Sequence, residues 1–280
     1  MEPLPISVVV CVRNRAEEIE GCLESILANH PAEVLVMDGD SEDETRVRAA
    51  RYPVQVINCG RRGLAHDRAL GMQMAQQPFV AYVDSDVRIA PKTLETLLAE
   101  LQERGWAGIH AQIDGAPPRN YWEWAQDQHF QLTFNHPGPR SSIGLVCALF
   151  RTDVLREVGF AEGLSAAEDG DLSLHLTARG YTLGVAAQAR CIHHHRADFR
   201  SFFQQRIWYG EGTMRLALLR KSLWIAMGPL LMPFAASGLA LLKGQPRLIP
   251  YFWANALGYW VGMSRELSRA LSRRLSPRPT

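Results

Sequence analysis

Residues 79–86 read Phe-Val-Ala-Tyr-Val-Asp-Ser-Asp, an apolar run that ends in two acids one residue apart. The length and β-branched content of the run predict a buried strand. Side chains two apart share a face of a strand, so strand geometry that continues to its end predicts that Asp84 and Asp86 point together beyond it. Two close carboxylates repel unless a cation or proton lies between them, and oxygen ligands favour Mg²⁺ or Mn²⁺. An isolated Asp-x-Asp is more often a solvated acidic loop at a strand end, so the neighbouring segments have to decide.

The composition bounds the class of protein. The 280 residues can form one large domain or a domain with an appendage. The overall net charge is +1, but residues 201–280 carry +9 and residues 1–200 carry −8. Such a basic C-terminal part indicates contact with a negative surface. The five cysteines include no Cys-x-x-Cys pair, which favours reduced thiols in the cytosol, and the N-terminus shows no signal-peptide pattern.

Strand and helix patterns alternate through the first hundred residues. Apolar runs predict strands over 6–12, 33–37, 54–58 and 79–83, and helical spacing predicts helices that follow them, over 19–27, 64–75 and 91–104. Asn14 and Ser41 are candidate helix N-caps because an acid follows each of them by three residues. This alternation predicts an α/β fold with a parallel sheet and helices on both faces.

Polar residues follow each predicted strand, at the edge where such sheets bind ligands. They are Arg13-Asn14-Arg15, Asp38-Gly39-Asp40, Cys59-Gly60-Arg61-Arg62-Gly63 and Asp84-Ser85-Asp86. Acids can bind a metal or the edges of a base and ribose, and arginines bind phosphate, so the set indicates a nucleotide site. The absence of G-x-G-x-x-G and Walker A patterns argues against a dinucleotide oxidoreductase and a P-loop NTPase.

The order of these motifs resembles a family 2 glycosyltransferase with the GT-A fold, a Rossmann-like nucleotide-diphospho-sugar transferase domain. The matching pieces are residues 7–15, 34–45, 63–71 and the triplet 84–86, and later motifs extend the match to about residue 215. The resemblance implies a nucleotide-diphosphate sugar donor and Mg²⁺ or Mn²⁺ as cofactor. Ala69 and Asp40 depart from residues that the family often has there, which leaves the donor's identity open.

The resemblance also implies roles for individual residues. Asp38 would read the nucleobase edge, and Asp84 and Asp86 would hold the ribose and the metal-bound diphosphate. The predicted donor-binding set is Arg13, Asn14, Asp38, Arg68, Asp84, Asp86, Arg206 and Trp208. One residue, not two, separates Arg206 from Trp208, which departs from the Q-x-x-R-W motif of processive synthases and favours single transfer.

Three acids, Glu168, Asp169 and Asp171, open a predicted helix. The helix dipole favours acids there, which could explain all three. Sugar transfer with inversion needs a carboxylate that takes the proton of the acceptor hydroxyl. By resemblance to the family's Glu-Asp-x-Asp-Leu element, Asp169 is the predicted base, Glu168 a neighbour that positions donor or acceptor, and Asp171 a structural residue.

A histidine run, His193-His194-His195, follows the next predicted strand. In related transferases a histidine at this place can complete the metal site or contact diphosphate. His193 fits that position best, and His195 is the alternative because both would share a face of an extended chain. The predicted metal ligands are therefore Asp86, Asp84 and His193. The aromatic segment 121–134 is open between a sugar-stacking wall, a membrane-bound helix and a core-packing helix.

The C-terminal part predicts membrane attachment. Residues 222–242 contain no charge and are long enough to cross about 30 Å of hydrocarbon. Residues 248–263 are shorter and rich in Trp and Tyr, so they can span, re-enter or lie along the surface. A buried helical hairpin of a soluble dimer is the alternative. The predicted organisation is a catalytic domain over 1–200, a linking helix over 201–221, membrane helices over 222–264 and a basic tail over 265–280.

The sequence thus predicts an inverting, metal-dependent glycosyltransferase on the cytoplasmic face of the cell membrane. Its partners would be a nucleotide-diphosphate sugar, the membrane and a lipid-linked acceptor, with a glycan or small-molecule acceptor also open and no nucleic acid. A nucleotidyltransferase, which shares the α/β sheet and paired acids, and a non-catalytic membrane scaffold are the rival classes. The sequence names neither the sugar, the base, the acceptor nor the oligomeric state.

Overall fold

A computed structural model describes residues 2–161, 163–164 and 166–275. The chain forms two compact units. The first consists of Met1–Ala116, Phe130–Gly163 and Glu168–His194, and the second of Pro117–His129, Leu164–Ala167 and His195–Thr280.

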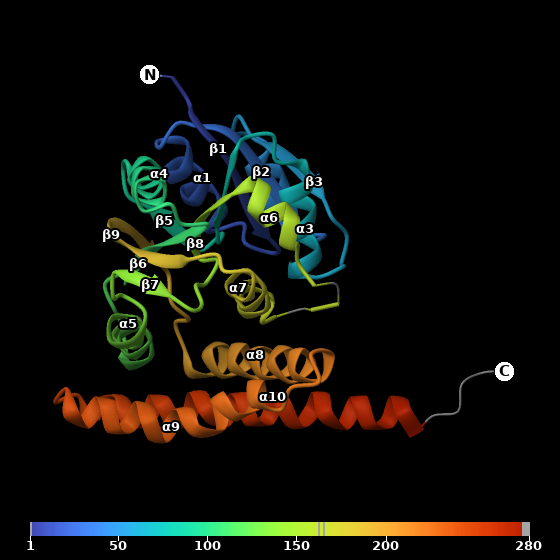
Figure 1. The fold of residues 1–280 in the computed structure, drawn as a ribbon, viewed down its shortest axis with the longest axis vertical. Helices are drawn as coiled ribbons and strands as arrows, with labels where there is room; N and C mark the ends of the chain where they lie inside the picture. The colour runs from blue at the N-terminus through green and yellow to red at the C-terminus, as the bar shows by residue number, and fades with distance from the viewer. Residues whose placement is uncertain (1, 162, 165, 276–280) are drawn as a thin grey trace. The chain divides into compact units, whose positions relative to one another are not determined.

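The first unit is built on a mixed sheet (Figure 1). The strand order is β3-β2-β1-β4-β8-β6-β9-β5, and β7 also pairs with β9. The first four neighbours in that order are parallel, as predicted, whereas β8, β5 and β7 run antiparallel to the strands they pair with. The four strands from which the parallel sheet was predicted are thus parallel, and the strands after β4 make the sheet mixed. The bounds are β1 Leu4–Val12, β2 Pro31–Asp38, β3 Gln55–Asn58, β4 Phe79–Val83, β5 Val87–Ile89, β6 Gly108–Gly115, β7 Gly138–Arg140, β8 Cys147–Arg151 and β9 Leu183–His193.

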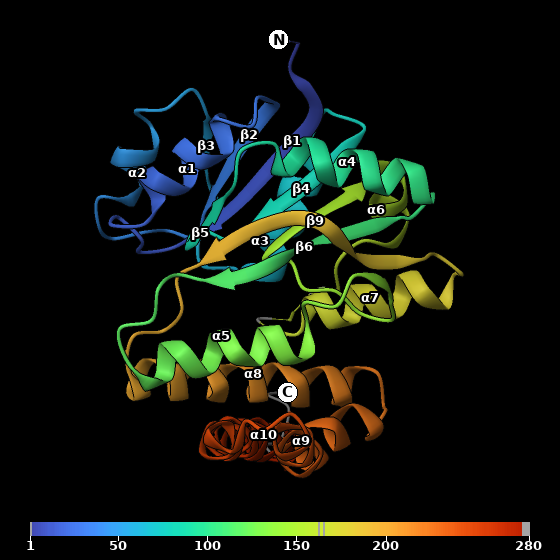
Figure 2. The same ribbon diagram turned by 90° about the vertical axis from the view of Figure 1, so that its left-hand side faces the viewer.

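Helices cover both faces of this sheet (Figure 2). Successive side chains of β1 point to opposite faces of the sheet and enter two separate hydrophobic clusters. Ile6, Val8 and Val10 pack with α1 and α4 in the first cluster. Val9 packs with residues of α3, α6 and α7 in the second. Both clusters consist of buried apolar side chains, so burial on both faces holds the sheet in place. The helices are α1 Ile19–Leu27, α2 Thr45–Ala49, α3 Leu64–Met74, α4 Thr93–Arg104, α6 Thr152–Val158 and α7 Glu168–Ala178.

The second unit is helical. It contains most of α5 (Tyr121–Thr133), then α8 (Phe199–Leu219), α9 (Trp224–Leu242), the short 3-10 helix η1 (Pro246–Leu248) and α10 (Ile249–Leu275). Trp122 of α5 packs against Phe199 and Phe202 of α8, with ring centroids 4.8 Å and 5.3 Å apart. Of the alternatives for the aromatic segment, core packing therefore describes Trp122.

The predicted bounds agree with the structure for α9 but not for α10. Helix α9 matches the uncharged segment, and among the described residues it is the one helix that is long and apolar enough to cross a membrane. Helix α10 begins where the shorter apolar segment was expected but continues twelve residues past it, to Leu275. The added turns are held by ion pairs such as that between Glu266 and Arg215, with 3.0 Å between Oε1 and Nε.

Candidate active site

Asp84, Ser85 and Asp86 form a turn between β4 and β5. The turn is closed by a 3.0 Å hydrogen bond in which the Val87 N–H donates to the Asp84 carbonyl. Strand geometry thus stops at Val83, so the condition on which alternation would aim the two carboxylates together is not met. Each acid meets its own set of partners.

Asp86 lies beside His193. The distance between Asp86 Oδ1 and His193 Nε2 is 3.4 Å, and both side chains are largely buried. Strand β5 pairs antiparallel with β9 so that Val87 lies opposite His193, and the His194 N–H donates to the Asp86 carbonyl at 3.0 Å. The backbone register therefore fixes this pair.

The Asp86–His193 pair fits a divalent cation. Carboxylate oxygen and imidazole nitrogen are ligands of Mn²⁺, and neighbouring ligands of an octahedral ion, each about 2.1 Å from it, lie about 3 Å apart. The observed 3.4 Å between the two atoms is close to that spacing. Within the described part of the chain no group of three or more His, Cys, Asp or Glu side chains forms a ready metal site. A cation held here would take its other ligands from water and from a bound phosphate.

Arg68 connects the turn after β4 with the start of α7. It lies on α3, is 5% exposed, and its Nη2 donates to Asp84 Oδ1 at 2.9 Å. Its Nη1 forms an ion pair with Glu168 at the start of α7. The Tyr82 hydroxyl donates to the Arg68 carbonyl at 3.0 Å, which fixes the backbone as well. Arg68 thus joins the β4 turn to the helix that carries the predicted base, and its donor-binding role stays a prediction.

Burial sets the protonation of the two acids that face Arg68. Burial raises the pKa of Glu168 from 4.5 to about 7, although the positive charge of Arg68 acts in the opposite direction. Removal from water likewise raises the pKa of Asp84, with Arg68 opposing and the Asp86 charge adding to the increase. His193 lowers the Asp84 pKa, so the groups from Glu168 to His193 form one electrostatic cluster.

Asp169 is the second residue of α7 and is partly exposed. Its Oδ1 accepts a hydrogen bond from the Gly170 N–H at 2.7 Å. Its Oδ2 lies 3.9 Å from the point where a Cβ on Gly144 would be, and His110 Nε2 lies 3.8 Å from the same point. Gly144 therefore leaves a space of about methyl size beside the carboxylate, where a small group can reach Oδ2.

Replacing Gly144 by alanine tests whether this space is used. The added methyl would meet only ordinary contact distances of 3.8 Å and 3.9 Å, so we expect stability to be unchanged. We expect release of nucleoside diphosphate from a donor sugar to fall about tenfold, because the methyl displaces the group that approaches Asp169. Gly170→Ala is the matched control, since a Cβ there meets nothing within 4 Å. Equal turnover in both variants would show that the space beside Asp169 is not where the acceptor enters.

The other predicted donor residues shape the loops after β1 and β2. Asp38 is fully buried, and its Oδ2 accepts from the Ser41 N–H at 3.0 Å. The Asn14 N–H donates to the Ser41 hydroxyl at 2.9 Å, and Asn14 Oδ1 accepts from the Glu42 N–H at 2.9 Å. Asn14 has a φ of 52° and does not cap α1, so its N-cap prediction is wrong, as is that of Ser41 for α2.

The remaining predicted donor residues are Arg13, Arg206 and Trp208. Arg13 is exposed directly after β1. Arg206 and Trp208 belong to α8 of the second unit, where the Arg206 guanidinium lies 4.9 Å from the ring centroid of Phe202 and 5.0 Å from that of Tyr209. Donor binding by these three residues stays a prediction.

A family model described as glycosyl transferase family 2 matches residues 7–159. The chain belongs to this family. The match spans the sheet from β1 to β8, including the Asp84–Asp86 turn and Arg68.

Several named proteins are similar to this family 2 glycosyltransferase. The pre-mycofactocin glycosyltransferase of Mycobacterium tuberculosis is 27% identical over 230 residues, which are 76% of this chain and 47% of that protein. The chain thus spans about half the length of that relative. Glycosyltransferase AglE of Haloferax volcanii is 23% identical over 245 residues, which are 80% of this chain and 80% of that protein.

Solved structures establish the fold of the family 2 transferase as GT-A. S. aureus TarS 1-349, solved in complex with UDP-GlcNAc, has a TM-score of 0.56 and 17% identity over 97% of this chain and 92% of that one. GalNAc-T7, solved with UDP, GalNAc and Mn²⁺, has a TM-score of 0.55 and 19% identity over 68% of this chain and 43% of that one.

Two residues of the transferase's site had no assigned role in the sequence prediction. Asp67 is buried beside Arg68, and its Oδ2 lies 3.3 Å from the Cβ position of Gly39 in the loop after β2. Its position within the 63–71 motif was the available signal. His110 of β6 is buried near Gly144, and burial lowers its pKa from 6.5 to about 4. Nothing in the local sequence distinguishes His110 from a core residue.

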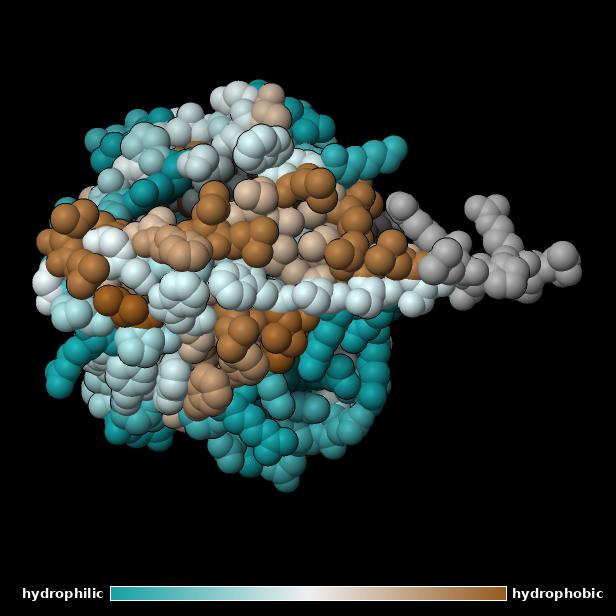
Figure 3. Space-filling view, turned by 90° about the horizontal axis from the view of Figure 1, so that it is seen from below, coloured by the Kyte–Doolittle hydropathy of each residue, from teal (hydrophilic) through white to brown (hydrophobic). Residues whose placement is uncertain are grey.

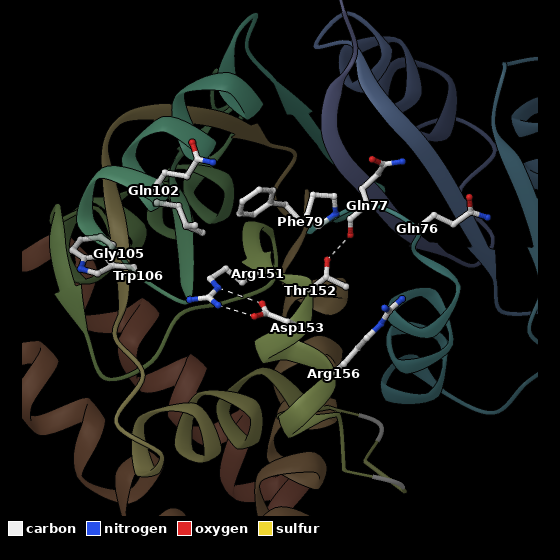
Figure 4. A pocket seen from close by; sticks show the side chains of 12 residues that line it. Gln76, Gln77, Phe79, Gln102, Gly105, Trp106, Arg151, Thr152, Asp153 and Arg156 are labelled. Atoms are coloured by element: carbon white, nitrogen blue, oxygen red, sulfur yellow. Dashed lines mark hydrogen bonds and ion pairs between the residues drawn. The ribbon is translucent and has the colours of Figure 1, made fainter.

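A separate pocket of about 810 Å³ lies elsewhere in the first unit (Figure 4). It is lined by Phe79 at the start of β4, by Trp106, and by the ion pair of Arg151 with Asp153. Asp84 follows the opposite end of β4. The pocket is therefore distinct from the candidate active site.

Proposed function

We propose that this family 2 transferase moves a sugar from a nucleotide-diphosphate sugar to an acceptor hydroxyl, with inversion at the anomeric carbon. The observation that carries the proposal is that the buried Arg68 pairs with both Asp84 and Glu168, which joins the β4 turn to the start of α7. Asp86 and His193 act electrostatically on Asp84, and Asp169 on Glu168, which supports one site for both substrates. A likeness to structures solved with UDP-sugar components supports the choice of donor.

Asp86 and His193 are the residues that would hold Mg²⁺ or Mn²⁺ on the donor side. Such an ion, when bound, neutralises charge on the departing diphosphate. Asp84, which stays paired with Arg68 through one oxygen, adds a second carboxylate beside that position. In this assignment Arg68 and the β5–β9 register keep the acids in place before the donor arrives.

Asp169 is the proposed general base. Its Oδ2 would accept the proton of the acceptor hydroxyl as the new oxygen–carbon bond forms. The bond between the anomeric carbon and the diphosphate oxygen breaks at the same time, and its electron pair leaves with the diphosphate. The space beside Gly144 leaves room for the acceptor group to approach that oxygen.

We further infer that the acceptor is lipid-linked and is used at the cytoplasmic face of the membrane. The support is the exposed apolar surface of α9 and α10, since an enzyme attached to a bilayer meets lipid-linked substrates there. A glucosyl-dolichyl phosphate glucuronosyltransferase of Haloferax volcanii, 33% identical over 104 residues, carries a lipid-linked sugar in its name.

Asp86→Ala tests the donor side. UDP-, GDP- and dTDP-sugars would first be screened with Mn²⁺ by thermal shift, and the binding donor then titrated. We expect Asp86→Ala to lose about tenfold or more of the Mn²⁺-dependent donor affinity, because a metal ligand is removed. The exposed Asp153, changed to Ala, is the control.

Undiminished Mn²⁺-dependent affinity in a folded Asp86→Ala sample would overturn the metal-site assignment. The same donor, labelled once in the sugar and once in the nucleotide, separates the two enzyme classes. Label from the sugar in the product supports glycosyl transfer, whereas label from the nucleotide would identify a nucleotidyltransferase.

A further inference from the structure

Helices α8 and α10 of the second unit pack with their backbones in contact. A Cβ on Gly210 would lie 2.2 Å from the Tyr259 carbonyl oxygen, and one on Gly262 would lie 2.0 Å from that of Ile207. Glycines are therefore required at these two positions, because any side chain would force the helices apart. A Cβ on Gly258 would lie 2.4 Å from the Arg206 Cβ, and Glu266 pairs with Arg215 further along, so α8 and α10 run side by side in the same direction.

Ion pairs extend this contact toward the C-terminal halves of both helices. Arg215 Nε lies 3.0 Å from Glu266 Oε1, and Arg269 Nη1 lies 3.1 Å from Glu211 Oε1. The Glu266 side chain is only 3% exposed, so its charge depends on the arginine partners. The pairs hold α8 against α10 well beyond the glycine contacts.

Helix α9 lies along α10 in the opposite direction. The Trp260 indole N–H donates to the Pro229 carbonyl at 3.1 Å. The rings of Phe234 and Trp253 meet with their centroids 5.2 Å apart. Higher numbers on α9 thus meet lower numbers on α10, and all three helices are nearly aligned over the same stretch.

This alignment argues against α9 as a transmembrane helix. If α9 crossed a bilayer, α10 and then α8 would enter the hydrocarbon with it, because they are packed beside it. Pro229 of α9 lies level with Trp260 of α10, and the adjacent glycines Gly258 and Gly262 pack on α8 at Arg206 and Glu211. Helix α8 would bring these two charges into the bilayer, and charged side chains in the membrane interior are costly and rare.

The outer face of α9 is apolar and free of charge. Its most exposed large side chains are Trp224 at 83%, Phe234 at 62%, Leu241 at 59% and Leu242 at 87%. A space-filling view shows brown, hydrophobic residues gathered on the face where α9 and α10 lie (Figure 3). Contiguous apolar surface of this kind marks an interaction site.

Basic residues border this face, and acids do not. Between residues 199 and 275 the acids are Glu211 and Glu266, both of which are paired with arginines. The bordering cations are Arg220 and Lys221 before α9, Lys243 and Arg247 after it, and Arg265, Arg269 and Arg273 on α10. An apolar strip with a basic border complements a bilayer that contains anionic lipids.

We propose that α9 lies in the plane of the membrane–water interface, and that the transferase binds anionic bilayers from one side without crossing them. The apolar face of α9 enters the boundary between headgroups and acyl chains, and the bordering cations meet lipid phosphates. The inference specifies the membrane attachment in the proposed function, but it rests on α8, α9 and α10 alone. Its test therefore uses no catalytic readout, and its failure leaves the transfer reaction untouched.

Accessibility of the two ends of α9 distinguishes the topologies. Lys221→Cys and Lys243→Cys variants of the full chain would be added to preformed vesicles of phosphatidylcholine and phosphatidylglycerol and labelled with an impermeant maleimide. We expect labelling at both positions from outside, with the parent chain as background because four of its five cysteines are buried. Protection of position 243 until detergent is added would overturn the proposal, since it would show that α9 spans.

Flotation of the chain with vesicles tests the lipid chemistry. We expect the bound fraction to rise about tenfold when anionic lipid is added to phosphatidylcholine, and to fall in high salt. The double variant Trp224→Ser/Phe234→Ser should lose binding, whereas Val47→Ser, which changes an exposed side chain of α2, should not. If the chain instead forms a stable dimer that shields position 224 and does not float, the apolar face of α9 binds a second copy of the chain. That result would overturn the proposal.

Discussion

Replacing Arg68 by methionine is expected to lower the free energy of unfolding by about 3–5 kcal/mol, the range for removing one partner of a buried ion pair. Arg68 is 5% exposed and Glu168 is 3% exposed, so water cannot take over the role of the guanidinium. Asp84 loses its partner in the same step. Chemical denaturation at fixed pH measures the change.

The raised pKa of Glu168 also makes the free energy of unfolding depend on pH. The pKa of Glu168 is raised from 4.5 to about 7 in the folded chain, so the folded state binds its proton more tightly than the unfolded state. The contribution of Glu168 to stability is therefore present below pH 4.5 and is lost as the pH rises to about 7. Without Arg68 the pKa should rise further, so the loss should extend above pH 7.

Two controls separate the buried pair from ordinary surface charge. Arg151→Met removes an exposed partner of Asp153 and should change stability by less than about 1 kcal/mol. Adding Glu168→Gln to Arg68→Met should restore part of the loss, because the unpaired acid is then neutral. If Arg68→Met costs no more than Arg151→Met, the Arg68 bridge does not hold α7 to the β4 turn.

Local patterns in the sequence predicted the local elements well. The strands β1 to β4 and the helices between them lie within a few residues of the expected ranges, because apolar periodicity reflects the two-sided burial of this sheet. The antiparallel entry of β8 between β4 and β6 was not predictable, since pairing between distant strands leaves no periodic signal.

The site shows the same division between local and long-range information. The residue types and the Asp86–His193 placement were predicted, whereas the ion pair between Arg68 and Glu168, 100 residues apart, was not. Asn14 carries the sequence signature of an N-cap but takes a left-handed conformation, because Ser41 and Glu42 of the next loop bind it. Tertiary contacts override the local signal at such positions.

Asp169→Asn is expected to lower the turnover number by about 10²–10⁴-fold, the contribution of a positioned general base. Asparagine has the same shape, and its side-chain oxygen can still accept the 2.7 Å hydrogen bond from Gly170. Because the Asp86–His193 pair is unchanged, the donor affinity should stay within about twofold of the parent value. Single-turnover transfer and donor titration on the same sample separate the two effects.

Asp171→Asn is the informative contrast to this variant, because the two acids lie two residues apart on α7 and differ in exposure. Asp171 is 1% exposed, whereas Asp169 is partly exposed. We therefore expect Asp171→Asn to lower the melting temperature while the folded fraction keeps its turnover. Asp169→Asn should keep the melting temperature and lose turnover. Full turnover in Asp169→Asn would remove it as the base, and Glu168, whose pKa of about 7 lies near neutral pH, would then be the next carboxylate to test.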